Sequence, residues 1–264
     1  MRFPRRGAAG SGSKRGQPGS GGSGPGRGRV KRLLPAAIAL GILAILTSPG
    51  RRAARSVARS IDARVEHFSD PESRVYARFL APLLSRMYRG VSNDVVAELA
   101  ARGRSRRATI LDLGCGPGDL ALELAHRLRD ARIVGLDLSP SMLQLAARHA
   151  TTDGRLRFVV GNATALPFSD GTVDLVVSTL SLHHWSDPAA VFYEIARVLK
   201  SGGVALIYDI GLLSATPNQV ATFAAEAGLG EDELVRERVK GGLGTHLFVR
   251  FRLEGPAPED DAEF

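Results

Sequence analysis

The sequence predicts a doubly wound α/β fold, in which helices cover both faces of a mostly parallel sheet. From residue 109 onward, short apolar runs alternate with amphipathic stretches of helical period, and this alternation is typical of such a sheet. A glycine-rich stretch, "LGCGPGDL" at 113–120, follows the first apolar run, and an acidic residue, Asp137, ends the second. These features favour a ligand site at the carboxyl ends of the strands.

The order of elements can be read from the apolar runs and the helix-start signals. Ser139 and Asp187 each precede a proline, the ordinary pairing of an N-cap with a first helical residue. Residues 233–239 and 246–254 are expected to pair as a closing antiparallel hairpin. The parallel strands are expected at 109–113, 132–138, 156–161, 173–178 and 204–210. The predicted architecture is a Rossmann-like, doubly wound seven-stranded sheet with this hairpin, preceded by N-terminal helices.

Composition divides the 264 residues into unequal segments. The expected segments are a disordered basic tail rich in Gly, Ser and Arg (1–32), an apolar segment (33–49), a helical lead-in that covers the site (50–103), the α/β domain (104–254) and an acidic tail (255–264). Residues 33–46 carry no charge but are shorter than the ~20 apolar residues of a full membrane span. They are compatible with a membrane anchor or with an upstream extension of no consequence.

The net charge of +8 comes from the N-terminal part of the chain. Residues 1–61 hold 13 Lys and Arg and no acidic residue, whereas the remainder holds 22 basic and 27 acidic residues. The folded part is therefore acidic, and no nucleic-acid partner is expected. No zinc-type spacing is present, so no metal is expected. The single cysteine, Cys115, excludes an intramolecular disulfide and suits a reducing compartment. The sequence carries no signal for oligomeric state.

The glycine turn indicates a ligand that carries a ribose and a group seeking N–H donors. Glycines let a ligand approach the backbone, and the following helix offers free N–H groups. Asp137 lies 19 residues after Gly118 and can accept from ribose hydroxyls. A dinucleotide and S-adenosylmethionine both satisfy this description. "GPGDLA" at 116–121 matches the dinucleotide pattern, but this short motif is a weak signal by itself.

Four motifs in order resemble the class I S-adenosylmethionine-dependent methyltransferases, especially the ubiquinone/menaquinone-biosynthesis branch (Methyltransferase type 11). They are "LDLGCGPG", "VGLDLSPSML", "GNATALPFSDGTVDLVVSTLSLHHW" and "EIARVLKSGGVALIYD", and the resemblance covers roughly residues 75–211. It implies S-adenosyl-L-methionine as the cofactor and a small-molecule methyl acceptor. It also implies cofactor-binding roles for Asp112, Gly114, Gly116, Gly118, Asp137, Leu138, Met142, Asn162, Ala163 and Ser178.

In that resemblance each position has an expected task. Asp112 and the three glycines shape the pocket for the methionine part, and Asp137 binds the ribose. Leu138 and Met142 lie against the adenine, although core packing accounts for them nearly as well. Most relatives have Asp where this chain has Asn162, whose carbonyl can still accept a hydrogen bond but carries no charge. Somewhat weaker cofactor binding is expected.

His183 and His184 are the candidate catalytic residues. They follow the fourth parallel strand in the motif "LHHW", where a substrate is met in folds of this kind. A base is needed only if the acceptor must lose a proton. The alternative is that both residues form a wall of the pocket.

Two other functions remain compatible with the sequence. One is an NAD(P)-dependent oxidoreductase of Rossmann type, and the other is a non-catalytic, membrane-tethered module that binds the cofactor. The leading interpretation is a methyltransferase (EC 2.1.1.-) that acts on a small molecule, and the apolar segment at 33–46 suggests a lipophilic acceptor, quinone- or lipid-like. Its catalytic domain is expected in the cytoplasm, possible membrane contact being confined to residues 33–59.

Overall fold

The computed structural model describes six stretches of the chain: 81–104, 106–150, 154–211, 214–230, 237–239 and 248–256. The basic tail, the apolar segment, the first part of the helical lead-in and residues 257–264 lie outside them. Within the described stretches, no helix combines the length and apolarity that a membrane crossing requires.

Helices and strands alternate through the described part as the apolar pattern predicts. The helices are α4 (Ala81–Ala101), α5 (Asp119–Arg127), α6 (Pro140–Ala146), α7 (Pro188–Val198) and α8 (Pro217–Glu226), with 3-10 turns η2 (Ala147–His149) and η3 (Leu182–His184). The strands are β1 (Thr109–Leu113), β2 (Arg132–Asp137), β3 (Leu156–Val160), β4 (Val173–Thr179), β5 (Leu199–Ile210), β6 (Glu237–Val239) and β7 (Phe248–Glu254).

The strands form one seven-stranded sheet in the order β3-β2-β1-β4-β5-β7-β6. β1 to β5 are parallel, whereas β7 runs antiparallel to both β5 and β6. The predicted seven-stranded sheet and its closing hairpin are thereby confirmed. The strand order reverses between β1 and β4, and a ligand in such a sheet binds at the carboxyl ends of the strands beside this reversal.

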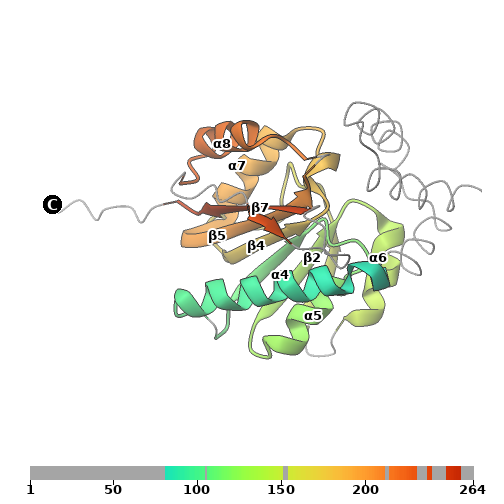
Figure 1. The fold of residues 1–264 in the computed structure, drawn as a ribbon. Coiled ribbons are helices and arrows are strands. Elements are labelled where there is room, and N and C mark those ends of the chain that lie inside the picture. Colours follow the sequence, from blue (N-terminus) through green and yellow to red (C-terminus); the bar gives the residue numbers. More distant parts are fainter. Residues whose placement is uncertain are drawn as a thin grey trace, which may run out of the picture.

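Helices cover both faces of the sheet (Figure 1). α4 and α5 pack on one face around Leu99, Leu124 and Ile110, whereas α7 and α8 pack on the other around Phe192 and Ile207. All five of these side chains are fully buried. Both faces of β1, β2 and β4 are therefore largely shielded from solvent, as their nearly continuous apolar sequence requires, whereas the edge strand β3 is partly exposed.

The helix starts follow local capping chemistry. The Ser139 hydroxyl accepts from the Met142 N–H at 3.4 Å, and the Asp187 carboxylate accepts from the Ala190 N–H at 3.1 Å. Each cap satisfies one of the free N–H groups in a first helical turn. Both predicted caps are confirmed.

β5 begins earlier than the glycines suggest. The sequence places its start at Val204, but the strand begins at Leu199, which pairs with Val173. Gly203 explains the difference, because a Cβ there would lie 2.9 Å from the Lys200 carbonyl oxygen. The glycine permits a close backbone approach within the strand and does not end the preceding helix.

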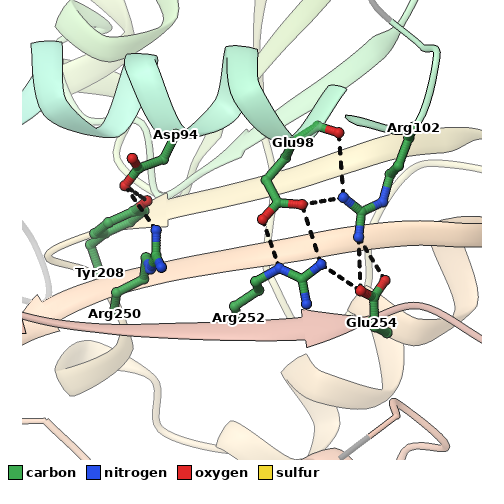
Figure 2. A network of polar contacts seen from close by, with 7 residues as sticks. All are labelled: Asp94, Glu98, Arg102, Tyr208, Arg250, Arg252 and Glu254. Atoms are coloured by element: carbon green, nitrogen blue, oxygen red, sulfur yellow. Dashed lines mark hydrogen bonds and ion pairs between the residues drawn. The ribbon is translucent and has the colours of Figure 1, made fainter. Parts of the chain in front are cut away.

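A polar network joins α4 to β7 (Figure 2). On α4 its members recur every four residues, and on β7 every two, so each set lies on one face of its element. The network comprises Asp94, Glu98 and Arg102 of α4, Tyr208 of β5, and Arg250, Arg252 and Glu254 of β7.

Glu98 is the centre of this network. Its carboxylate accepts from Arg252 Nε at 2.6 Å and from Arg102, which also donates to both oxygens of Glu254. Burial alone would raise the pKa of Glu98, but the hydrogen bonds from the two arginines outweigh it and hold the pKa below its usual value. The ionised form of Glu98 is thus part of the folded state.

We expect Glu98→Gln to lower the free energy of unfolding by ~1–2 kcal/mol at pH 7, because two guanidinium groups lose their shared charged partner. The pKa of Glu98 is lower in the folded than in the unfolded state, so its contribution is present above the unfolded pKa and is lost as pH falls through the folded value. The deficit should therefore shrink below pH ~4. Urea unfolding at several pH values measures it, with the exposed Glu226→Gln as control. An equal effect from both variants would contradict the role of the network.

Candidate functional site

The glycine turn links β1 to α5 at the carboxyl edge of the sheet. Gly114, Gly116 and Gly118 have φ values of 73°, 53° and 84°, in the left-handed region where a side chain is strained. The N–H groups of Gly114 and Cys115 both donate to the Leu136 carbonyl, at 2.8 and 3.0 Å. The turn is therefore fastened to β2 through its backbone.

Two of the turn glycines are needed for close packing as well. A Cβ at Gly114 would lie 2.4 Å from Ser181 Oγ, and one at Gly118 would lie 2.7 Å from the Phe158 ring. A Cβ at Gly116, by contrast, would meet nothing within 4 Å. Phe158 therefore packs against Gly118, and Ser181 packs against Gly114. The turn is open at Gly116, where a ligand can approach the backbone.

The sequence prediction missed Ser181, Phe158 and Gly135. Gly135, in β2, faces the same aromatic ring: its Cβ would lie 2.5 Å from Phe158 and 2.8 Å from Cys115 Sγ. The glycine in "VGLDL" is the signal that could have indicated this close approach.

Three carboxyl groups surround the turn. Asp137 ends β2, and its Oδ2 and Oδ1 accept from the N–H groups of Gly116 and Ser139, each at 2.8 Å. Asp112 in β1 is fully buried, and within the described stretches neither of its oxygens has a hydrogen-bond partner; Asp119 Oδ2 is also buried without one there. A buried oxygen without a partner is uncommon in native proteins and is a feature of functional sites.

Burial dominates the titration of these groups. Burial, with the neighbouring Asp137 carboxylate, raises the pKa of Asp112 to about 8. Burial also raises the pKa of Asp119, against the effect of His149. It raises the pKa of Asp137 although hydrogen bonds from Ser139 and Gly116 favour the ionised form. No described group therefore supplies a positive charge that would stabilise the ionised form of Asp112.

The other predicted cofactor residues line the same edge of the sheet. Leu138 follows Asp137 directly and is 60% exposed, whereas Met142 of α6 is 4% exposed. Asn162 and Ala163 follow β3, and Asn162 Oδ1 accepts from the Thr164 N–H at 3.0 Å. An adenine amine would share that oxygen with Thr164.

Ser178 lies near the end of β4 and is fully buried. Its hydroxyl has no hydrogen-bond partner in the part of the chain that the structure describes. The strand pairing brings the ends of β4 and β1 together, because Val177 pairs with Asp112. The described structure thus gathers at one edge all ten residues predicted to bind the cofactor. Their contacts with a cofactor stay a prediction.

The loop after β4 holds the two histidines. It leaves the strand at Leu180, which has a left-handed φ of 56°, an unusual conformation for this residue type. His183 Nδ1 lies 2.6 Å from Asp209 Oδ1, and the His183 N–H donates to Asp209 Oδ2 at 3.0 Å. Asp209, at the end of β5, is fully buried and was not predicted. It fixes the ring of His183.

His184 and Trp185 differ from His183 in their surroundings. His184 is exposed as a residue, yet protein atoms surround its ring; this desolvation and the neighbouring His183 lower its pKa. Trp185 Nε1 donates to Ser181 Oγ at 2.8 Å, which connects the histidine loop to the residue beside Gly114. The loop and the glycine turn are therefore in direct contact.

The residues present fit a ribose-bearing ligand with a positive charge better than they fit a metal ion. Within the described part of the chain, no three His, Cys, Asp or Glu side chains form a metal-binding group. Unpartnered buried oxygens on Asp112 and Ser178, and the open backbone at Gly116, are instead available to an organic ligand.

Comparison with known families agrees with this site. Residues 111–207 match the family described as "Methyltransferase domain". This segment is similar to the class I S-adenosylmethionine-dependent methyltransferases of the ubiquinone/menaquinone type, and S-adenosylmethionine is the cofactor of that class.

The related proteins carry several reaction names. Over 101 residues the chain is 41% identical to demethylmenaquinone methyltransferase of Thermus thermophilus, covering 38% of this chain and 46% of the relative. Over 121 residues it is 34% identical to a malonyl-[acyl-carrier protein] O-methyltransferase of Hahella chejuensis, covering 46% and 42%. The chain thus spans less than half the length of these curated relatives.

Solved structures share the fold at low identity. A protein from Methanococcus maripaludis, described provisionally as an S-adenosylmethionine-dependent methyltransferase, aligns with a TM-score of 0.57 at 22% identity, over 73% of this chain and 95% of its own. The [4+2]-cyclase SpnF aligns with a TM-score of 0.54 at 21% identity, over 64% and 80%. SpnF shares this fold but is named for a cyclisation, so the fold by itself does not determine the reaction.

We expect Gly135→Ala to lower the free energy of unfolding by ~1–3 kcal/mol, because the new methyl group overlaps Phe158 and Cys115. Replacing the opposing ring by a smaller side chain, in the double variant Gly135→Ala/Phe158→Leu, should recover part of that loss. Urea unfolding of the two single variants and the double variant measures the coupling.

Gly90→Ala is the matched control for this experiment. Gly90 lies in α4, and a Cβ there would meet nothing within 4 Å, so the variant should be as stable as the wild type or more stable. Strictly additive effects at positions 135 and 158 would show that the overlap does not account for the glycine.

Proposed function

We propose that this protein transfers a methyl group from S-adenosylmethionine to a small acceptor that carries an acidic hydroxyl or enol. The observation that supports the proposal is the His183–Asp209 pair, which belongs to a loop in direct contact with the glycine turn. Cofactor and base would thus meet at one edge of the sheet. When bound, the cofactor supplies an activated methyl group on a sulfonium.

The hydrogen bonds of Asp209 determine which nitrogen of His183 can act as the base. An ionised carboxylate only accepts hydrogen bonds, so the Nδ1 that lies beside it carries the proton. A proton removed from an acceptor hydroxyl would then pass to Nε2, the other ring nitrogen. Asp209 also accepts from the Ile210 N–H at 2.8 Å, so it is held in place from the backbone. We assign Asp209 as a positioning residue and His183 as the base.

The nature of the acceptor is the second part of the proposal. Curated relatives are named for a demethylmenaquinone and for a malonyl thioester, which favours a small or lipophilic molecule. The uncharged segment 33–46 suits an acceptor dissolved in a membrane. Arg102, just beyond the end of α4, contacts Glu254, which pairs with Val204 in the first half of β5, so the first residue of α4, Ala81, points towards the carboxyl edge that holds the site. We propose that the catalytic domain faces the cytosol, where the methyl donor is made.

The first experiment is calorimetric titration of the full chain with S-adenosylmethionine and, separately, with NADH. Micromolar binding of S-adenosylmethionine that is lost in Asp137→Ala supports the cofactor assignment. Binding of NADH instead would favour an oxidoreductase. Binding of S-adenosylmethionine without turnover of any acceptor would favour a non-catalytic, cofactor-binding module.

We expect His183→Ala to reduce the rate of methyl transfer to a hydroquinone probe, such as naphthohydroquinone, by ~10²-fold or more while cofactor affinity changes little. Asp209→Asn should reduce kcat in the same direction, because an amide no longer imposes the Nδ1–H tautomer. Formation of S-adenosylhomocysteine measures both. His184→Ala is the matched control and should lose less activity. A larger loss of activity in His184→Ala than in His183→Ala would contradict the assignment of His183 and favour His184 as the base.

A further inference from the structure

The glycine turn is surrounded by carboxyl groups and by no described cation except an imidazole. Asp112 comes from β1, Asp119 from the start of α5 and Asp137 from the end of β2. His149 acts on Asp119 alone. Asp137 and Asp119 both disfavour a negative charge on Asp112, so the ionised form of Asp112 is costly in this buried position.

Asp112 is the member of this cluster with the least support for a negative charge. Its side chain is fully buried, and neither oxygen accepts a hydrogen bond from any residue that the structure describes. Among the described groups, only the backbone N–H of Ala121 favours its ionised form, and that N–H lies outside hydrogen-bonding geometry. Asp137, by contrast, accepts two backbone N–H groups. Hydrogen bonds therefore stabilise the ionised form of Asp137 more than that of Asp112.

The remaining surroundings of Asp112 do not offset this difference. The ionisable groups that face it are Asp137 from β2, Asp119 from α5 and the Cys115 thiol of the turn, whose own pKa is raised by burial and by Asp112. β4 presents Val177 opposite Asp112, and no described charged group of α4 or β4 acts on it. Burial and the neighbouring Asp137 carboxylate thus favour the protonated form of Asp112 near neutral pH.

We propose that Asp112 holds a proton in the free protein and releases it to solvent when the cationic cofactor binds, so that the proton and the cofactor compete for one pocket. The inference rests on the proposed function, because it takes S-adenosylmethionine as the ligand. In chemical terms, the O–H bond of the carboxyl group breaks, the proton passes to buffer, and the carboxylate that remains faces the positive charges of the ligand.

The exchange of the proton for the cofactor predicts how the affinity for the cofactor changes with pH. Below the pKa of free Asp112, binding must expel a proton, so the affinity rises with pH by up to about tenfold per pH unit and levels off above that pKa. Cofactor binding in an acidified cell would thus weaken without any conformational change. Asp112 acts here as a residue that selects for a cationic ligand over a neutral one of the same shape.

The test is calorimetric titration of the full chain with S-adenosylmethionine at pH 7 in phosphate and in Tris, whose ionisation enthalpies differ. The dependence of the observed enthalpy on the buffer gives the number of protons released. We expect close to one proton per site for the wild type and for Asp119→Asn, and almost none for Asp112→Asn. Asn has the shape of a protonated Asp, so the fold should be retained.

The outcomes separate this inference from the proposed function. No binding of S-adenosylmethionine by the folded wild type would contradict the proposed function. Binding whose enthalpy is the same in both buffers would overturn the proton exchange and leave the cofactor assignment intact. Release that persists in Asp112→Asn and is lost in Asp119→Asn would overturn the assignment to Asp112.

A second measurement needs no cofactor and decides the matter if Asp112→Asn binds too weakly for calorimetry. The pKa of Asp112 is higher in the folded than in the unfolded state, so its contribution to stability is lost as pH rises towards the folded value. Between pH 5 and 7.5, the unfolding equilibrium constant of the wild type should rise about tenfold per pH unit relative to Asp112→Asn. Parallel curves for the two proteins would contradict a protonated Asp112.

Discussion

The hydrogen bond from the Gly116 N–H to the Asp137 carboxylate is the interaction on which the site depends. It fastens the open part of the glycine turn to the end of β2, at 2.8 Å. The same carboxylate accepts from Ser139, the N-cap of α6, so one side chain positions the turn and the next helix. Because Leu136 also accepts two N–H groups of the turn, the backbone at Gly116 is held rigidly while its outer side remains open.

Features that depend on a few consecutive residues were predictable from the sequence. The glycine spacing requires left-handed backbone, and Gly114, Gly116 and Gly118 have it. Caps at Ser139 and Asp187 depend on residues three positions away and were confirmed. The strand pattern gave the sheet and its hairpin. β5 was placed five residues late because a glycine pair is ambiguous: it can end a helix or allow two backbones to approach.

Features that depend on distant segments could not be predicted in the same way. Ser181 lies against Gly114 across 67 positions, and Asp209 meets His183 only because β4 and β5 are neighbours. Glu98 and Arg252 each lie on a readable periodic face, yet their pairing requires that β7 insert beside β5 under α4. Sequence periodicity indicates which faces are polar, but the sheet order determines which faces meet.

Two buried aspartates at the same edge of the sheet differ in their hydrogen-bond partners, and this difference suits them to different roles. Asp209 accepts hydrogen bonds from two backbone N–H groups and contacts the imidazole of His183, so it can orient His183 without rearrangement. Asp112 is buried as deeply but has no hydrogen-bond partner among the described residues, so its charge depends on which ligand binds beside it. Burying a carboxyl without a partner costs stability, and such a cost persists where a ligand removes it. The satisfied group therefore suits orientation of the base, and the unsatisfied group suits recognition of a cation.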